Sequence, residues 1–520
     1  MRTIGLFVGF MALTAVGCGA PEAEDTPSLA RPQTGTLRPQ SFSLHSGRQV
    51  VVFKSATLPS DAAARIAGAG AKTKASVASI GVAIVEADAA AIAKLAADGS
   101  VAAVGPELSW KLPKPGYKKV APSPASSAPD VFWGAQWDQR RIKSNVAWSN
   151  VSPAAQANVT VAVLDTGVMS DHPDLLGRVI ESVSTSLSDT VLGCQGPQGP
   201  DAAYPLYFTR INLVTGDLCE PVWDQESVQT HGTHVSGTIA GNYGGGVLEP
   251  YGFPGGIVGV APYANIAAYK VFDRMVIPGP DGAPFEIVTA TDYAVFTAIV
   301  DAAAKGRAVI NMSLGGAINR QNPDENASWL AWNRVAKLAT QMGTLIVAAA
   351  GNDNANNNGA VAFIPSDLPG VVSVAATGSS NLQGGAFPND FPFGTWDAAP
   401  GSDVRAFYSN FGAAVNIAAP GGDCGPDFAA SPGNCDPRHL IVSSVPLWDP
   451  ASGQLFAGYE WSAGTSMASP HVAGVAALVK AKNPSFSPAR IKARLEQTAT
   501  AIGSRQAFGS GLVDADLATR

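Results

Sequence analysis

The sequence predicts an α/β protein with a mostly parallel, doubly wound sheet, preceded by a small α+β domain. From about residue 130, apolar β-branched runs alternate with alanine-rich amphipathic runs. The first run, Val159 to Leu164, has no period-two polarity, as expected of a strand buried on both faces. Similar strands are predicted at 266–271, 309–312, 345–350 and 371–375, with helices at 292–305 and 329–342. The net charge of −7 and the absence of a long basic run exclude an electrostatic nucleic-acid binder.

The first 18 residues are typical of an export signal. Met1-Arg2 supplies a positive start, and the apolar stretch at 4–16 is too short to span ~30 Å of hydrocarbon as a helix. The small residues before Cys18 are similar to the end of a bacterial lipoprotein signal, in which Cys18 becomes the lipidated N-terminus. An ordinary secretory signal is the alternative. Both interpretations predict an exported bacterial protein. With a lipoprotein signal, the precursor is expected to be held in the cell envelope.

Composition divides the rest of the chain into four parts. Residues 19–47 are polar and proline-rich and predict a flexible tether. Residues 48–110 predict a domain with the order strand, helix, strand, helix, strand, at 49–53, 60–69, 77–85, 87–97 and 101–104. Residues 111–128, rich in Pro, Lys and Ser, predict a linker, and 129–520 form the main domain.

The remaining cysteines are even in number, which in an oxidising compartment predicts disulfides. They are Cys194, Cys219, Cys424 and Cys435, and three pairings are possible. The local pairs, Cys194 with Cys219 and Cys424 with Cys435, are the simplest hypothesis because each closes a loop rich in Gly and Pro. No CxxC pattern indicates zinc.

Three segments place reactive side chains at predicted strand ends or helix starts. Asp165 ends the strand in Val-Leu-Asp-Thr-Gly, and His231 opens His-Gly-Thr-His-Val-Ser-Gly-Thr. Ser466 lies in Gly-Thr-Ser-Met-Ala-Ser-Pro-His-Val-Ala-Gly, where Pro470, expected in a first helical turn, predicts a helix that begins near Ser466. Taken singly, an Asp or Ser here is typical of a helix cap. The pair of His231 and His234 also has the spacing of metal ligands, but no acidic residue follows as in a zinc motif.

Together these segments indicate nucleophilic catalysis, because Asp, His and Ser follow one of the known chain orders of a Ser-His-Asp triad. A Ser amide at a helix start, beside the positive end of the helix dipole, suits a nucleophile whose intermediate is an oxyanion. The three segments resemble the signatures of the subtilisin-like serine peptidases, over roughly residues 130–520. Residues 48–110 resemble the inhibitory N-terminal propeptide of that family.

The resemblance implies a role for each site residue. Ser466 attacks the scissile carbonyl, His231 takes the proton and returns it to the leaving amine, and Asp165 holds the imidazole tautomer. The segment Ala-Ala-Ala-Gly-Asn is similar to the oxyanion segment of the family, which nominates the Asn352 amide beside the Ser466 N–H. Backbone groups of Ser313, Leu314 and Gly315 are expected to bind an extended substrate, and Ala349, Ala350 and Gly351 to line a roomy apolar pocket. Ordinary core strands are the alternative for both segments.

The implied partners are protein or peptide substrates and the propeptide itself, acting as intramolecular inhibitor and folding aid. No cofactor is expected for the chemistry, and contact with a membrane is expected only through a lipid on Cys18. Calcium often stabilises this family. The oxygen-rich segments 351–354 and 356–358 are candidates that serve equally well as turns, so no metal ligand is assigned.

Self-processing of the linker, between about Gly116 and Asp130, is expected to release the mature enzyme from a lipid anchor that precedes the cut. Two rival hypotheses use the same scaffold. One is a pseudoenzyme, a lipid-anchored binding protein, which the complete triad argues against. The other is a peptide ligase or cyclase that uses the same acyl-enzyme.

Overall fold

The computed structural model describes residues 42–43, 47–112, 116–119, 130, 132–194, 209–221, 230–245, 247–248, 253–254, 256–278, 283–384, 394–429, 435–449, 451 and 453–520. The expected signal segment with Cys18, most of the tether and most of the 111–128 linker lie outside these ranges. Within them, no helix is both long and apolar enough to cross a bilayer.

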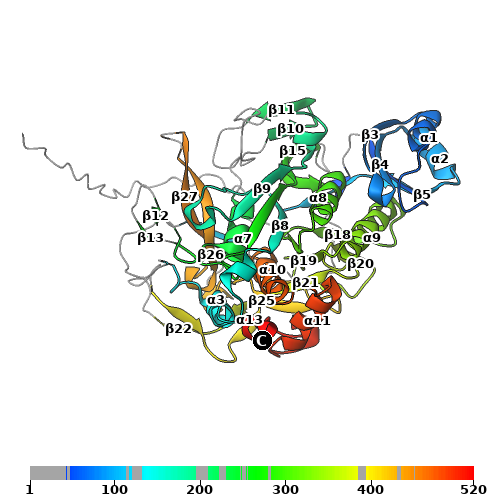
Figure 1. Ribbon diagram of the computed structural model, residues 1–520. Helices are drawn as coiled ribbons and strands as arrows, with labels where there is room; N and C mark the ends of the chain where they lie inside the picture. The colour runs from blue at the N-terminus through cyan, green and yellow to red at the C-terminus, as the bar shows by residue number, and fades with distance from the viewer. Residues whose placement is uncertain are drawn as a thin grey trace, which may run out of the picture.

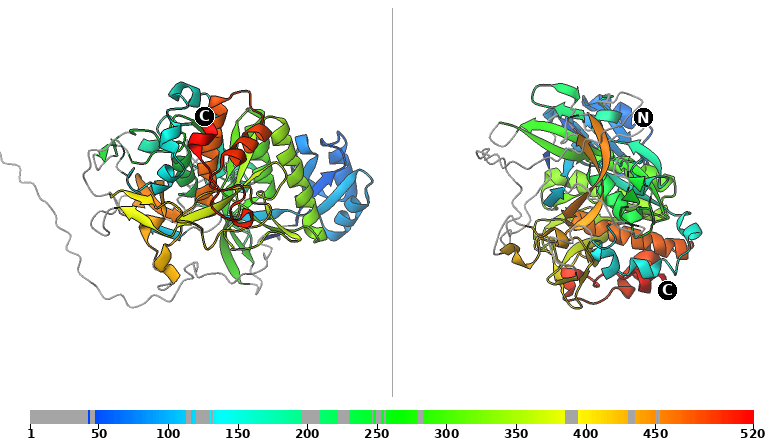
Figure 2. Two further views of the ribbon diagram at one scale, coloured as in Figure 1. Left: turned by 90° about the horizontal axis from the view of Figure 1, so that it is seen from below. Right: turned by 90° about the vertical axis from the view of Figure 1, so that its left-hand side faces the viewer.

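The N-terminal unit is a four-stranded antiparallel sheet with the strand order β3-β4-β2-β5. Its elements are β2 (Arg48–Phe53), α1 (Ala62–Ala69), β3 (Lys72–Val77), β4 (Val82–Glu86), α2 (Ala89–Ala97) and β5 (Val101–Pro106). Its own apolar core includes Phe53, Ile66 and Leu95. The predicted order of elements lacked β3, because this edge strand is largely exposed and carries no apolar alternation. The left view of Figure 2 shows the unit as a blue lobe at one end of the molecule.

The main sheet is mostly parallel, with the strand order β24-β21-β19-β17-β8-β14-β9 and β25 paired to β21. Only β24 runs antiparallel to its neighbour. Its strands are β8 (Thr160–Asp165), β9 (Val179–Ser184), β14 (Asn265–Lys270), β17 (Val309–Met312), β19 (Leu345–Ala349), β21 (Val372–Ser379), β24 (Asp403–Arg405) and β25 (Ile417–Pro420). The predicted fold class is confirmed.

Helices cover both faces of this sheet, as alternate residues of β8 show. Val161 and Val163 belong to one core cluster with α7 (His231–Ala240) and α10 (Thr465–Lys482). The intervening residues, Ala162 and Leu164, pack in a second cluster with α8 (Asp292–Ala304) and α9 (Asn326–Gln341). This two-sided burial explains why the strands carry no polar alternation.

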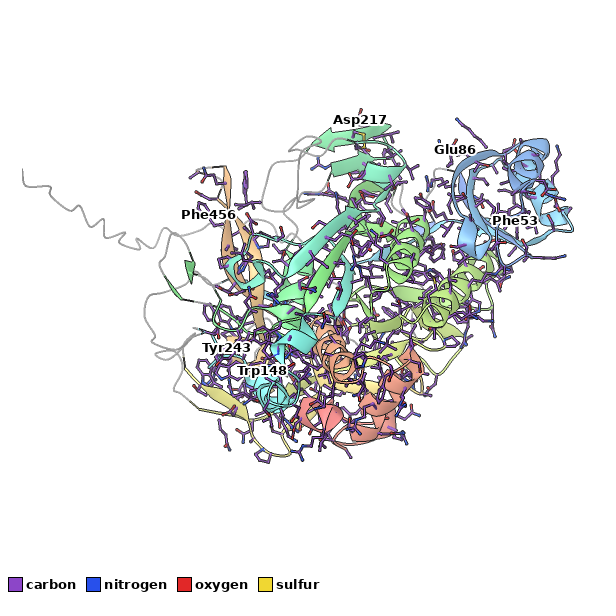
Figure 3. All side chains as sticks on the ribbon, in the orientation of Figure 1. Phe53, Glu86, Trp148, Asp217, Tyr243 and Phe456 are labelled. Atoms are coloured by element: carbon purple, nitrogen blue, oxygen red, sulfur yellow. A yellow bond between two sulfur atoms is a disulfide. The ribbon has the colours of Figure 1, made fainter. Side chains whose placement is uncertain are left out.

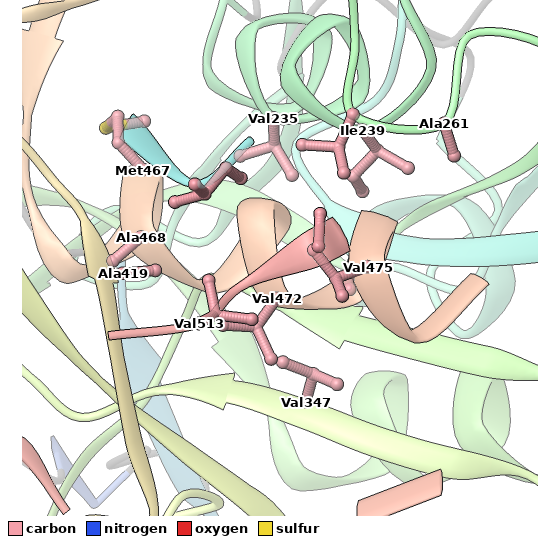
Figure 4. Packing of buried hydrophobic residues seen from close by; sticks show 14 of the residues in the cluster. Val235, Ile239, Ala261, Val347, Ala419, Met467, Ala468, Val472, Val475 and Val513 are labelled. Carbon is pink, nitrogen blue, oxygen red and sulfur yellow. The ribbon is translucent and has the colours of Figure 1, made fainter. Parts of the chain in front are cut away.

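Helix α10 lies at the centre of the first cluster. Its residues Val472 and Val475 pack between Val235 and Ile239 of α7 on one side and Val347 of β19 on the other (Figure 4). Nearly every α10 residue is buried. The start of this helix, which carries Ser466, is therefore held firmly against the sheet.

Two further sheets extend the main domain, and each accepts a strand from the N-terminal part of the chain. One sheet has the order β1-β6-β16-β15-β10-β11, and the other has the order β26-β27-β7. Their strands are β1 (Phe42–Ser43), β6 (Leu108–Lys111), β7 (Gly116–Lys119), β10 (Thr209–Asn212), β11 (Asp217–Pro221), β15 (Phe272–Pro278), β16 (Pro284–Thr291), β26 (Ile441–Asp449) and β27 (Gln454–Ala463). Figure 3 labels Asp217 and Phe456 on the two projecting hairpins that these sheets form.

Shorter elements complete the main domain. They are α3 (Trp137–Arg141), α4 (Ser144–Ala147), α5 (Pro153–Gln156), α6 (Leu187–Thr190), α11 (Pro488–Thr498), α12 (Arg505–Phe508), α13 (Ala515–Thr519), and the strand pairs β12 (Val247–Leu248) with β13 (Phe253–Pro254), β18 (Gly316–Asn319) with β20 (Val361–Ile364), and β22 (Leu382–Gly384) with β23 (Trp396–Ala398). Both local disulfides, Cys194–Cys219 and Cys424–Cys435, are formed, as expected from the sequence.

The N-terminal unit packs on α9 and α8 (Figure 1). Arg334 of α9 donates from Nη1 to the carbonyl oxygens of Ser55 and Ile80, each at 3.1 Å. The chain then leaves β5 for β6, which pairs with β16, and for β7, which pairs with β27. The N-terminal chain thus contacts helices α8 and α9 and pairs with strands β16 and β27 of the main domain.

Candidate active site

Asp165 and His231 meet where β8 ends and α7 begins. The imidazole Nδ1 lies 2.8 Å from Asp165 Oδ1 and 3.0 Å from Oδ2. The Thr166 N–H donates to Oδ1 at 2.7 Å. Both side chains are buried. The carboxylate therefore fixes one imidazole nitrogen, and Nε2, which has no hydrogen-bond partner among the described residues, is left to act as a base.

The small residues around His231 allow α7 to approach β8 closely. A Cβ on Gly232 would lie 2.3 Å from the carbonyl oxygen of Gly167 and 3.1 Å from Asp165 Cβ. The Gly232 N–H donates to Thr166 Oγ1 at 3.0 Å. Any larger residue at 232 would force the helix start away from Asp165, so this glycine sets the distance between His and Asp.

Ser466 lies in the first turn of α10, which begins at Thr465 as the sequence predicts. Its side chain is buried, and Oγ donates to the carbonyl oxygen of Ser313 at 3.2 Å. From the sequence we expected Pro470 in that first turn, but the structure places it in the second. Proline cannot donate to the Ser466 carbonyl four residues earlier. Ser313 Oγ supplies that bond instead, at 2.8 Å, which explains why the proline is tolerated there.

Asn352 follows β19 and faces the start of α10. Its Oδ1 accepts bonds from the Thr465 N–H at 2.9 Å and from Thr465 Oγ1 at 2.7 Å. A Cβ built on Gly464 would lie 3.3 Å from Asn352 Nδ2 and 3.6 Å from the Ser466 nitrogen. Both nitrogens therefore lie beside the same glycine, which places no side chain between them. Two neighbouring N–H donors next to an open position are what an oxyanion site needs.

The expected substrate-binding segments follow β17 and β19 at the same edge of the sheet, where the carboxyl ends of parallel strands carry ligands. Gly315 and Gly351 both lie against the Phe363 ring, because a Cβ at either position would come within 2.8 Å of it. Leu314, Ala349 and Ala350 are fully buried. Their side chains are therefore covered in the full chain, in which Leu314 belongs to the same apolar cluster as Trp110 of the N-terminal segment.

His234 has contacts that fit a structural role rather than a metal ligand. It is buried, and its Nε2 lies 3.2 Å from the Ile441 oxygen and 3.1 Å from the Glu460 oxygen. Burial lowers the pKa of His234 to about 3, so the ring is neutral. Among the described residues no group of three or more His, Cys, Asp or Glu side chains could hold a metal, which argues against a metal role for this histidine pair.

Sequence reasoning missed a pair of buried carboxylates, Asp130 and Asp174. Burial raises the pKa of each to about 6, and the Asp174 charge adds to the effect on Asp130. Asp174 Oδ1 is buried and has no hydrogen-bond partner among the described residues. The N–H groups of Gly244 and Gly245 donate to Asp130 at 3.0 and 3.4 Å. Two neighbouring buried carboxylates, one with an oxygen that has no described partner, are of the oxygen-ligand type that calcium prefers.

The oxygen-rich segment after Gly351 serves as a turn. Asn410 Oδ1 accepts from the N–H groups of Asp353 at 2.9 Å and Ala355 at 3.0 Å. Asn358 Nδ2 bonds Gln506 Oε1 at 2.9 Å. These contacts favour the turn interpretation over a calcium site.

Comparisons with known proteins agree with this geometry. Residues 156–511 match the family model described as the Subtilase family. Subtilisin Savinase from Lederbergia lenta is 33% identical over 365 residues, which cover 70% of this chain and 91% of the relative. Subtilisin NAT from Bacillus subtilis subsp. natto is 29% identical over 365 residues, and the match spans 70% of this chain but only 66% of that relative.

Solved structures show the same fold. The epidermin leader peptide processing serine protease from Staphylococcus aureus matches with a TM-score of 0.58 and 22% identity, over 91% of this chain and 97% of that one. Fervidolysin from Fervidobacterium pennivorans, described as a keratinolytic enzyme related to subtilisin, matches with a TM-score of 0.58 and 25% identity, over 93% of this chain and 62% of that one.

Proposed function

Because the chain belongs to the subtilase family of serine endopeptidases, we propose that it hydrolyses peptide bonds in proteins through an acyl-enzyme on Ser466. The observation that carries this proposal is the contact of both Asp165 oxygens with His231 Nδ1, at 2.8 and 3.0 Å. A histidine with a purely structural role would be expected to have hydrogen-bond partners on both ring nitrogens, whereas His231 has both carboxylate oxygens on Nδ1 and no described partner on Nε2.

The reaction proceeds by proton transfer through His231. The Ser466 hydroxyl turns from the Ser313 oxygen to His231 Nε2, loses its proton there and attacks the scissile carbonyl carbon. The protonated imidazole, stabilised by Asp165, gives that proton to the leaving amine as the C–N bond breaks. Water then attacks the acyl-enzyme in the same way and frees Ser466. The N–H groups of Asn352 and Ser466 stabilise the oxyanion in both steps.

Residues 48–110 act as an intramolecular inhibitor and folding aid in this proposal. The pairing of β6, the strand that directly follows this unit, with β16 supports this role, since it holds the end of the unit against the main domain, and Ser466 is buried in the full chain. Gly116 lies opposite Ala463, three residues before Ser466. In the sequence, the segment between Leu112 and Gly116 therefore directly precedes a strand that pairs with the segment leading to the nucleophile.

This register favours self-processing between Leu112 and Gly116, just ahead of the Gly116–Asp130 range expected from composition. A cut there separates the mature enzyme from everything before it, including a lipid on Cys18, and releases an exported enzyme from the membrane. N-terminal sequencing of the mature form tests this. A start near Cys18 in active enzyme contradicts it.

The chemistry needs no cofactor. A calcium ion held by Asp130 and Asp174 would be structural, and its role would be to neutralise two buried carboxylates that otherwise repel each other. The calcium dependence of unfolding tests this role.

A fluorophosphonate probe tests the main proposal, with casein hydrolysis as the second readout. The self-processed wild type should label and hydrolyse casein, and Ser466→Ala should do neither and should stay full length. A processed wild type that does not label would favour a binding protein on this scaffold. Labelling with joined rather than hydrolysed peptide products would favour a ligase.

A further inference from the structure

The strongest unexplained feature outside the triad is a buried carboxylate that binds two indoles. Asp292, at the start of α8, is fully buried. Its Oδ1 accepts from Trp110 Nε1 and from Trp332 Nε1, each at 2.8 Å. Its Oδ2 accepts from Ser328 Oγ and, at 3.3 Å, from the Leu108 N–H. The triad does not use any of these residues.

The donors come from two different parts of the chain. Trp332 and Ser328 belong to α9 of the main domain, whereas Leu108 and Trp110 lie on β6, on the N-terminal side of the proposed cut. The Trp110 and Trp332 rings meet edge to face, with centroids 5.6 Å apart. When the N-terminal segment leaves, Asp292 keeps the α9 donors but loses both donors of β6.

The site lies on the strand that leads to the proposed cut. Trp110 lies opposite Ala290 of β16, and its side chain belongs to the core cluster that contains Leu314. The same chain continues to Gly116, which pairs with Ala463 near Ser466. A substrate that replaces this segment would put one side chain where Trp110 now lies.

The position that the Trp110 side chain occupies suits an apolar ring that donates a hydrogen bond. Its walls are apolar and aromatic, and Phe296 packs edge to face on Trp332 with centroids 5.1 Å apart. Its end is a single acceptor atom, Asp292 Oδ1. Burial raises the pKa of Asp292 to about 7, which shows how poorly solvated the carboxylate is, and the three side-chain donors oppose that shift. A buried acceptor that loses a donor gains most from a ligand that restores it.

We propose that Asp292 is a specificity-determining residue that selects substrates with tryptophan on the N-terminal side of the cleaved bond, by accepting the indole N–H at the place of Trp110. This rests on the proposed peptidase function. Phenylalanine fills the same apolar space but cannot donate, so it leaves Asp292 Oδ1 with one donor fewer. A site built around a hydrogen bond discriminates strongly against an analogue that lacks the donor.

The test uses quenched-fluorescence peptides with the sequence of residues 105–119 and the self-processed full-length product. Position 110 carries tryptophan, benzothienylalanine, which replaces the indole N–H by sulfur at almost the same shape, or phenylalanine. We expect kcat/KM for tryptophan to exceed that for benzothienylalanine by about 10- to 100-fold, the range of a hydrogen bond to a charged group. If a peptide is not cleaved, its inhibition constant against casein hydrolysis gives the same ratio. Equal values for the two peptides overturn the proposal.

Variants of Asp292 test whether its carboxylate causes the preference for tryptophan. Asp292→Leu should bring the ratio of tryptophan to benzothienylalanine close to one, and Asp292→Asn, which keeps a neutral acceptor, should leave a few-fold preference. Asp301→Asn, the same change further along α8, should keep the wild-type ratio. Active-site titration with the fluorophosphonate probe counts folded enzyme, so the Asn variant still decides the matter if the Leu variant does not fold.

The full-length chain offers an independent check. Trp110→Phe removes only the donor of the inhibitory segment, and we expect a shorter lag before activity rises. An unchanged lag, together with equal peptide ratios, contradicts the proposal while leaving the peptidase function intact. No label and no hydrolysis in any assay would instead contradict the peptidase function.

Discussion

The Ser466 hydroxyl donates to the carbonyl oxygen of Ser313 at 3.2 Å, while His231 Nε2, the base in the proposed reaction, has no partner among the described residues. In the full-length chain the nucleophile is therefore held by the backbone of a neighbouring loop rather than by its base. In the proposed reaction the serine side chain must therefore rotate toward His231 before it attacks.

Asp165→Asn should lower kcat by on the order of 10⁴, with a much smaller change in KM. The amide no longer holds Nδ1 protonated, so the imidazole loses the tautomer that accepts the serine proton. Steady-state kinetics on a chromogenic peptide measure the effect. Asp171→Asn, in an exposed part of the nearby loop, is the control and should match the wild type. A loss of less than tenfold in Asp165→Asn would argue that His231 has another partner in the active enzyme.

Asn352→Ala should lower kcat by about 10²–10³ and leave KM nearly unchanged, because the Nδ2 donor stabilises only the oxyanion. Asn158→Ala, at an exposed position near α5, serves as the control. The fluorophosphonate probe should still label the Asn352 variant, though more slowly. An increase in KM with normal kcat would place Asn352 in substrate binding instead.

Ser313→Ala should reduce the free energy of unfolding by about 1–3 kcal/mol, because it leaves the buried Ser466 carbonyl without the donor that Pro470 cannot supply. Urea unfolding in the Ser466→Ala background, which prevents self-digestion, measures this. Ser149→Ala, which removes an exposed hydroxyl, should cost much less. Equal losses in the two variants would show that the Ser313 bond contributes little.

Asp174 should make the calcium-free protein less stable as the pH rises from about 4 to about 6. The pKa of Asp174 is raised to about 6 in the folded chain from 3.8, so the folded state binds more protons than the unfolded state in that window. Stability is therefore lost with rising pH and stays low above pH 6, where calcium should restore it. Thermal unfolding of the Ser466→Ala chain in a chelator gives the slope.

The matched variant for this prediction is Asp174→Asn, which carries no titrating group. Its stability should change less between pH 4 and 6 than that of the parent, and calcium should stabilise it less at pH 7. A parent and variant with the same slope would show that other buried carboxylates, such as Asp423, whose pKa burial also raises to about 6, cause the pH dependence.

Local pattern was enough for several features of this protein. Uniformly apolar runs such as Val159 to Leu164 predicted buried parallel strands, because a strand covered on both faces needs no polar alternation. The short loops between paired cysteines predicted both disulfides. The motifs around Asp165, His231 and Ser466 nominated the reactive groups, because the three residues follow a known chain order of the triad and their segments resemble the signatures of the subtilisin-like peptidases.

Only the tertiary structure revealed features that depend on residues far apart in the chain. The edge strand β3 has no apolar alternation, so pattern could not predict it. The bond from Ser313 to the Ser466 carbonyl, the pairing of Asp130 with Asp174, and the contact of Trp110 with Asp292 join segments that no local rule connects. Sequence periodicity reports which face of an element is buried. The partner that a buried polar group finds there is decided by packing, because desolvation makes an unpaired group costly wherever the fold happens to place it.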